Sequence, residues 1–326
     1  MSRRSFAAAA LASASLSAFA VTASAQTGPD LLIRPFPANR SVEADATTRH
    51  LFDTNTSNAD ADFSLTALEA QGRFRIFQGN AAQPVGGFAA TQLLIDTDDP
   101  AIPDTLGDYS LGAGLGLFAR SGWVGGITFA LGHASDSPFS DGNGWYGKAT
   151  LVVGKQDVWD GWGVGLAIEY NGNRTFRPDL PLPGIVFTKR FDEIQSVVTI
   201  GVPVTGIRWT PSEQWEVVLN YVFPDFVDAK VTFFPIKGLG IYGSVGQQTY
   251  AFWSETLADS NHRIFYRQRS AELGVEWKPT DNVAVVLSGG YAFSQEITAG
   301  WDRGDDVLLA DVDDAPFARL SLTFAY

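Results

Sequence analysis

The chain has no cysteine, one methionine and only three histidines among its 326 residues. The absence of cysteine excludes disulfides, thiolate chemistry and lipid anchoring through a cysteine. Charged residues make up only 18% of the chain, yet acidic residues outnumber basic ones and the formal net charge is −13. A chain with this excess of acidic residues repels anionic polymers, so we expect no nucleic-acid partner.

Long hydrophobic runs are missing after the first 21 residues. At the start, Arg3 and Arg4 precede a stretch rich in Ala and Leu, and Ala23-Ser24-Ala25 supplies the small residues of a cleavage site. This pattern predicts a secretory signal peptide over residues 1–25. Because no later segment is suited to a transmembrane helix, insertion into a membrane would require a closed β-barrel.

The C-terminal segment alternates strictly between apolar and polar or small residues. Leu320, Leu322, Phe324 and Tyr326 share one face of a strand, because successive side chains point to opposite sides. A final aromatic after alternating hydrophobics resembles the last strand of bacterial outer-membrane β-barrels. The resemblance implies that these four residues form an assembly signal for the barrel-assembly machinery.

Similar rows occur along the rest of the chain, which holds 33 glycines, 23 phenylalanines and nine each of tryptophan and tyrosine. The rows at 162–170, 215–223 and 283–293 carry aromatics at one or both ends and aliphatics between them. That arrangement is typical of interfacial girdles around a hydrocarbon band. The sequence therefore predicts an all-β protein, an antiparallel transmembrane β-barrel with short periplasmic turns and longer outer loops. Its location would be the outer membrane of a Gram-negative-type bacterium, with outer-membrane lipid as a partner.

The number of strands is less well defined by the sequence. Residues 63–326 contain fifteen candidate strands, whereas bacterial single-chain barrels normally have an even number. Either one candidate is false, or a further strand lies within residues 26–61. We predict about 14 strands, with 12 and 16 as alternatives. Residues 26–61 lack clean periodicity and are predicted to be an unpatterned periplasmic arm or linker, with the barrel at 62–326.

One internal repeat predicts two hairpins of the same design. Residues 206–213 and 274–281 share a Trp-x-Pro sequence, and each is followed at the same distance by two valines and a leucine. Proline cannot donate to a strand ladder, so we expect it to open a tight turn. If the C-terminus lies in the periplasm, the short turns fall on the periplasmic side and nearly all the long loops fall outside.

A second resemblance concerns the order of short proline motifs in the middle of the chain. These motifs are Pro183-Gly184-Ile185, Val202-Pro203, Trp209-Thr210-Pro211, Phe223-Pro224 and Phe234-Pro235. Their order is similar to that in an uncharacterised family of outer-membrane-type barrels known only as a domain of unknown function. The similarity spans about residues 60–326, and it implies the barrel fold without an established activity or catalytic residues.

The polar residues opposite the apolar rows are candidates for lining the lumen. The twelve candidates are Glu69, Gln71, Arg73, Arg75, Lys148, Glu169, Glu216, Asn220, Lys230, Glu272, Glu276 and Arg319. Mixed charges of this kind either line a water-filled pore or pair across a narrow interior and fill it. The sequence leaves both possibilities open.

Enzymatic and metal sites have weaker support. A catalytic nucleophile needs a base such as histidine. The three histidines, His50, His133 and His262, lie in no nucleophile signature. We therefore expect His133 and His262 to be solvated loop residues, and we expect no catalytic site and no cofactor. A further loop is crowded with aspartates: Asp302, Asp305, Asp306, Asp311, Asp313 and Asp314. Calcium accepts carboxylate oxygens from flexible loops, but the spacing does not match the calcium-loop pattern. We expect a solvated acidic loop rather than a metal site.

These features predict a porin-like passive channel or transporter for small solutes. No Gly-rich loop ending in Lys-Ser/Thr is present, so nucleotide-driven transport is not indicated. The alternative is a structural or adhesive outer-membrane barrel with a filled lumen. A weaker possibility is a lipid-acting enzyme at the rim, using His133 or His262.

Overall fold

The computed structural model describes Leu31 and residues 40–326, except 58, 60, 77–83, 141, 225, 256, 258 and 260. The predicted signal peptide therefore lies outside the described residues. No helix among the described residues is long and apolar enough to cross a membrane.

The described chain consists almost entirely of β-strands. They are β1 Val42–Thr56, β2 Ala61–Arg75, β3 Val85–Thr97, β4 Thr105–Arg120, β5 Trp123–Ser135, β6 Trp145–Trp159, β7 Trp162–Asn171, β8 Leu182–Phe191, β9 Ser196–Val202, β10 Val204–Ser212, β11 Trp215–Val222, β12 Phe226–Ile236, β13 Leu239–Trp253, β14 Arg263–Thr280, β15 Val283–Gly300, β16 Val307–Val312 and β17 Ala315–Ala325. A short 3₁₀ turn, Asp192–Ile194, connects β8 to β9.

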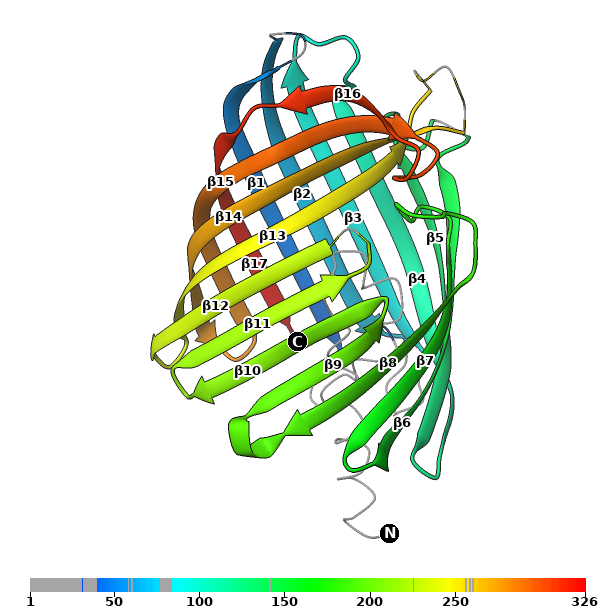
Figure 1. The fold of residues 1–326 in the computed structure, drawn as a ribbon, viewed down its shortest axis with the longest axis vertical. Coiled ribbons are helices and arrows are strands. Elements are labelled where there is room, and N and C mark those ends of the chain that lie inside the picture. Colours follow the sequence, from blue (N-terminus) through cyan, green and yellow to red (C-terminus); the bar gives the residue numbers. More distant parts are fainter. Residues whose placement is uncertain are drawn as a thin grey trace.

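The strands close into one barrel. Each strand from β1 to β15 pairs antiparallel with the next, and β17 pairs with both β15 and β1. Sixteen strands therefore form the ring, and Figure 1 shows how they are arranged as a barrel. The remaining strand, β16, adds to the end of β15 and touches β1 at one residue pair. The predicted barrel class is confirmed, but the strand number is sixteen rather than about 14.

The strand missing from the prediction is β1, which lies within the segment predicted to be a periplasmic arm. That prediction was wrong for residues 42–56, since β1 pairs with β2 along most of its length. The outward positions of its first half include Ala44, Ala46 and Thr48, so the apolar row has little contrast with the polar row. Adding β1 to the fifteen candidate strands gives the even number that a closed antiparallel barrel needs.

The two Trp-x-Pro segments form hairpins with the same register. Trp209 lies opposite Val217, and Trp277 lies opposite Val285, so the predicted repeat of two hairpins is confirmed. The prolines do not open the turns as expected. Register shifts follow each tryptophan, the strands continue through the proline, and the turns come later. An irregularity of this kind accommodates a residue that lacks a backbone N–H.

The two ends of the barrel differ in the length of their connections. At the end that carries Tyr326, here called the inner end, two-residue turns such as 121–122 and 281–282 join the strands. At the opposite, outer end, longer loops such as 172–181 and 301–306 predominate. The predicted asymmetry is present, with the expected short exceptions near Pro203 and Pro224. The predicted outer loop 295–315 also contains the end of β15 and all of β16.

The wall of the barrel is low on one side. Strands β9, β10 and β11 have 7, 9 and 8 residues, whereas β14 and β15 have 18 each. Figure 1 shows these short strands beneath the rising ends of β13, β14 and β15. Above the short strands, β13 reaches β5, where Trp253 pairs with Ser135 and the Asp136 N–H donates to the Trp253 carbonyl at 3.0 Å.

Candidate functional site

The outer surface of the barrel wall is apolar. Leu320, Leu322, Phe324 and Tyr326 are exposed on β17, whereas Ser321 and Ala325 between them are buried. Exposed apolar side chains continue around the ring, among them Leu111, Phe129, Leu166, Leu219, Leu273 and Leu287. A belt this extensive is unfavourable in water and matches the hydrocarbon band of a bilayer. The chain is a transmembrane β-barrel of the outer membrane. Recognition of the last strand by assembly machinery stays a prediction.

The strand register places the twelve predicted lining residues on the inward face. Cross-strand partners share a face, and the pairs Glu216 with Thr232 and Asn220 with Asp228 connect three strands of one wall. The pairs Ser244 with Glu272 and Ser288 with Arg319 connect the next wall in the same way. The apolar belt occupies the alternate positions, so charge faces inward and lipid-facing residues face outward.

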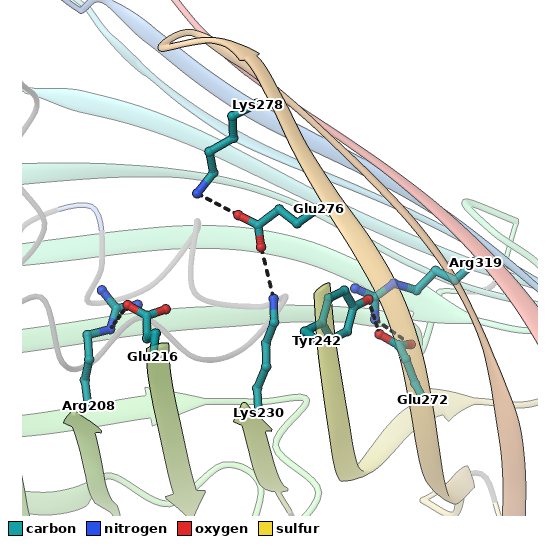
Figure 2. A network of polar contacts seen from close by, with 8 residues as sticks. All are labelled: Arg208, Glu216, Lys230, Tyr242, Glu272, Glu276, Lys278 and Arg319. Atoms are coloured by element: carbon teal, nitrogen blue, oxygen red, sulfur yellow. Dashed lines mark hydrogen bonds and ion pairs between the residues drawn. The ribbon is translucent and has the colours of Figure 1, made fainter. Parts of the chain in front are cut away.

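The inward charges on β10 to β17 form the contacts drawn in Figure 2. Arg208 Nε lies 3.6 Å from Glu216 Oε2, and Arg319 Nη1 lies 3.1 Å from Glu272 Oε2. Glu276 lies between two lysines, with Lys230 Nζ at 3.2 Å and Lys278 Nζ at 2.6 Å.

Three residues of this network were missed by sequence reasoning: Arg208, Tyr242 and Lys278. The Tyr242 hydroxyl donates to Glu272 Oε1 at 2.5 Å. Arg208 could have been found, because it alternates with Ile207 and Trp209 in a predicted hairpin. Lys278 could have been found in the same way, because it lies two residues after Glu276 and therefore on the same face of the strand.

Ion pairing does not fill this part of the interior. The Arg208 side chain is 64% exposed although it faces inward, and the side chains of Lys230 and Arg319 are 31% and 33% exposed. If opposite charges had closed the lumen, these side chains would have been buried. Solvent therefore reaches the inward charges on β10, β12 and β17.

A different arrangement occurs near the end of β2, at the inner end of the barrel. Arg73 is 1% exposed and donates from Nε and Nη2 to Glu43 Oε2, at 2.9 and 2.7 Å. Arg40 lies 3.7 Å from the other Glu43 oxygen. The partner of Arg73 could not be identified from the sequence, because Glu43 belongs to the unpredicted strand β1.

Towards the outer end the polarity of the two faces is reversed. On β2, the inward positions change from Glu69, Gln71 and Arg73 to buried Ala67, Leu65 and Phe63. The buried apolar residues of this region are called the cap core. They are Leu51, Phe63, Leu65, Ala67, Leu93, Ile95, Ile102, Leu106, Ala134, Tyr146, Tyr250, Phe252, Ile264, Tyr266, Ala292, Ile297, Ala310, Val312, Ala315 and Phe317. The charged lining therefore does not continue to the outer end.

A layer of hydrogen-bonded polar groups lies at the boundary between the charged interior and the cap core. Glu69 accepts hydrogen bonds from the Tyr250 hydroxyl at 2.5 Å and from Gln248 Nε2 at 3.4 Å. Arg49 lies over the Phe317 ring, 5.6 Å from its centre. The predicted lining residue Glu69 thus ties β2 to β13 across the barrel.

The histidines occupy three different environments. His133 is completely buried: the Phe139 N–H donates to its Nδ1 at 3.3 Å, and the rings of Phe139 and Trp145 pack against it. The expectation of a solvated His133 was wrong, because the loop after β5 folds back over it. His262 is partly exposed, with Nε2 3.6 Å from Asp259 Oδ2, and His50 Nδ1 lies 3.0 Å from the Thr66 hydroxyl.

The aspartates of the outer loop accept separate hydrogen bonds instead of converging. Asp302 is buried and accepts from the Gly304 N–H, Asp306 accepts from Thr298, and Asp313 accepts from Ser57. Asp314 accepts from the Ser294 N–H, Asp305 donates its N–H to the Asp302 carbonyl, and Asp311 lies in β16 opposite Glu296. No group of three or more potential ligands for a metal occurs in the described part of the chain. The expectation of a fully solvated loop was wrong for Asp302.

Comparison with known proteins gives no family. No family model matches the chain, and no curated protein matches it. The resemblance to the family of unknown function stays a prediction.

Solved structures with a similar fold are outer-membrane proteins and transporters. An outer membrane channel from Pseudomonas putida F1 is 11% identical, with 90% of this chain and 97% of that chain covered and a TM-score of 0.38. The outer membrane protein Omp33 of Acinetobacter baumannii is 11% identical, with 88% and 98% covered and a TM-score of 0.36. The toluene transporter TodX of Pseudomonas putida is 9% identical, with 93% of each chain covered and a TM-score of 0.39.

Proposed function

We propose that the protein is a porin-like passive channel for small polar solutes. The observation that carries this proposal is the solvent exposure of inward charges in the membrane-spanning wall. Arg208, Lys230 and Arg319 keep about a third to two thirds of their side-chain surface accessible. Water and charged side chains in the interior can take the place of part of the hydration shell of a small polar solute.

The lining contains both signs of charge in close pairs. Glu276 lies between Lys230 and Lys278, and Glu216 lies beside Arg208. Neighbouring opposite charges largely cancel at a distance, so neither cations nor anions are strongly concentrated in the interior. We therefore expect a channel with weak ion selectivity that follows the concentration gradient of its solute.

Conductance of the purified protein in a planar bilayer tests the proposal. We expect discrete current steps from the unmodified protein, and in Arg208→Glu a shift of the reversal potential towards cation selectivity. Arg269→Glu is the matched control, because Arg269 lies in an outward row of β14, beside Gln247, and its change should leave selectivity unaltered. A closed trace under conditions in which a known porin conducts would reject the channel.

The second candidate is a structural or adhesive barrel with a closed lumen. The cap core favours it, because buried apolar side chains close the outer end of the interior. This candidate predicts no current steps from the unmodified protein or from any variant. A catalytic role at the rim has no comparable support, since His133 is enclosed by aromatic rings.

A further inference from the structure

Among the described residues, the buried apolar side chains of the cap core occupy the outer end of the barrel interior. Leu93, Leu106, Phe252 and Ile264 are completely buried in it. A polar solute that crossed this region would exchange its hydration for apolar contacts, which is unfavourable without compensating hydrogen bonds. If the protein is the channel proposed above, the solute must pass somewhere other than through the cap.

The cap, meaning the strand ends and loops that carry the cap core, is built from only part of the ring. Its core residues come from β1–β6 and β13–β17 and the loops between them, and none of those in the described chain comes from β7–β12. The Ser254 hydroxyl donates to Asp136 at 2.5 Å, which adds to the contact between β13 and β5. β13 and β5 thus meet at the outer end, and Figure 1 shows β13 above the short strands β9, β10 and β11.

The polar lining continues upward on the low side of the wall instead. From Arg208 and Glu216, the inward face leads through Gly206 and Asn220 to Asp228. One inward row, Val204, Val222 and Phe226, separates these polar groups from the outer ends of the strands. The polar path therefore ends one residue row below the low rim.

The low rim lies where the membrane interface is expected. Tyr221 and Phe223 are exposed outward at the end of β11, as in an aromatic girdle. On the tall side, the outward row of β13 becomes polar at Gln247, which pairs with Val227 of β12 and accepts a hydrogen bond from Arg269. The cap accordingly rises beyond the apolar belt.

An unpaired strand edge borders the low rim. On the side of β12, the pairing of β13 ends at Gln247, and the segment Gln248–Phe252 has no strand partner there among the described residues, whereas Trp253 pairs with Ser135 of β5. The loop 172–181, which connects β7 to β8, covers this edge and is here called the gate loop. Asn173 Nδ2 donates to the Ala251 carbonyl at 3.0 Å and to Asp108 at 3.2 Å.

The gate loop makes further contacts at the outer end. The Arg303 N–H donates to the Thr175 carbonyl at 3.0 Å, and Arg263 Nη1 lies 3.4 Å from Asn173 Oδ1. Phe176 meets the Phe223 ring edge-on at the low rim, with ring centres 5.6 Å apart. None of these gate-loop residues belongs to the cap core, so release of the contacts would uncover the edge of β13 at Ala251.

We propose that the gate loop controls a lateral opening between the Gln248–Phe252 edge and the outer ends of β7–β12, and that small polar solutes pass through it while the cap stays closed. This inference rests on the proposed channel function. The solute enters or leaves at the level of the lipid headgroups, beside Tyr221, and crosses the polar wall formed by Asp228, Asn220 and Arg208.

Engineered disulfides test the route, because the chain has no cysteine of its own. In Thr175→Cys/Arg303→Cys, oxidation would fix the gate loop to the cap, and we expect loss of the current steps and their return on reduction. In Ser135→Cys/Trp253→Cys, oxidation would fix the cap itself, and we expect the steps to remain. The single-cysteine variants control for the substitutions.

A second variant tests the gate without a crosslink. Asn173→Ala removes the contacts to Ala251 and Asp108, so we expect a higher open probability, whereas Asn261→Ala in another outer loop should leave it unchanged. Normal current through the oxidised gate-loop variant, or loss of current only in the oxidised cap variant, would overturn the lateral route. Absence of current from the unmodified protein would instead reject the channel itself.

Discussion

Individual charged residues in this barrel have two distinct roles. Arg208 faces the interior and stays accessible, whereas Arg73 is buried against Glu43 with two hydrogen bonds to one carboxylate oxygen. A buried pair of this kind is costly to break, because the remaining charge loses both its partner and water. The first residue bears on permeation and the second on the stability of the contact between β1 and β2.

Removal of Arg73 alone should destabilise the barrel. We expect Arg73→Met to lower the free energy of unfolding by up to about 3–5 kcal/mol, because the buried Glu43 would lose both hydrogen bonds from Arg73 and keep the longer contact to Arg40. The double variant Glu43→Gln/Arg73→Met should recover much of that loss. Urea unfolding in lipid vesicles measures both. Equal stability of the Arg73 variant and the unmodified protein would contradict the structural role.

A turn at the inner end allows a test by pH. Asp160 lies between β6 and β7, and a hydrogen bond from Lys189 at 2.6 Å holds the pKa of Asp160 below its ordinary value. The contribution of this Asp160–Lys189 contact to the stability of the folded barrel is present above the pKa that Asp160 has in the unfolded chain. It is lost as the pH falls through the lower pKa of the folded state. We expect the NMR titration of the Asp160 carboxyl group to move upward in Lys189→Ala. An unchanged titration would rule out the contact.

At the scale of the strand, alternation determines which face meets lipid. Leu219 and Asn220 are neighbours on β11, yet Leu219 belongs to the outward row and Asn220 pairs with the inward Asp228. Lipid-facing positions tolerate charge poorly, whereas inward positions contact water. Two adjacent substitutions of the same kind should therefore have unequal effects.

We expect Leu219→Lys to lower the free energy of unfolding in lipid by about 2–4 kcal/mol. Asn220→Lys, one residue away, should cost much less, because its side chain points into the polar interior. Unfolding in vesicles compares the two variants directly. Similar losses in both would show that the faces have been assigned incorrectly.

Strand patterns could be predicted from the sequence where the two rows contrast strongly. The repeated hairpins around Trp209 and Trp277 were predicted with their shared spacing. Strand β1 was missed because alanines and threonines alternate with charged residues, which weakens the apolar row. The cap core was missed for another reason. On β2, the apolar residues lie on the outward face from Leu68 towards the inner end and on the inward face from Ala67 towards the outer end. Alternation alone therefore does not show which face is buried in each half of the strand.

At the scale of the whole molecule, two contrasting regions are stacked in one barrel. The membrane-spanning wall is apolar outside and charged inside, and the cap above it encloses an apolar core. The contact between Ser135 and Trp253 joins strands far apart in the chain, so no local pattern could predict it. Unequal strand lengths make this arrangement possible, since β9 to β11 end where the cap passes over them.

Cysteine accessibility in reconstituted vesicles tests this account most directly. In a chain without native cysteine, each variant carries a single thiol, so the reaction with a polar, charged thiol reagent reports whether water reaches that position. We expect Arg208→Cys in the wall to react rapidly and Phe252→Cys in the cap core to remain unreacted in the folded protein. Protection of Arg208→Cys, or equally rapid labelling of Phe252→Cys, would contradict a water-accessible interior beneath a closed apolar cap.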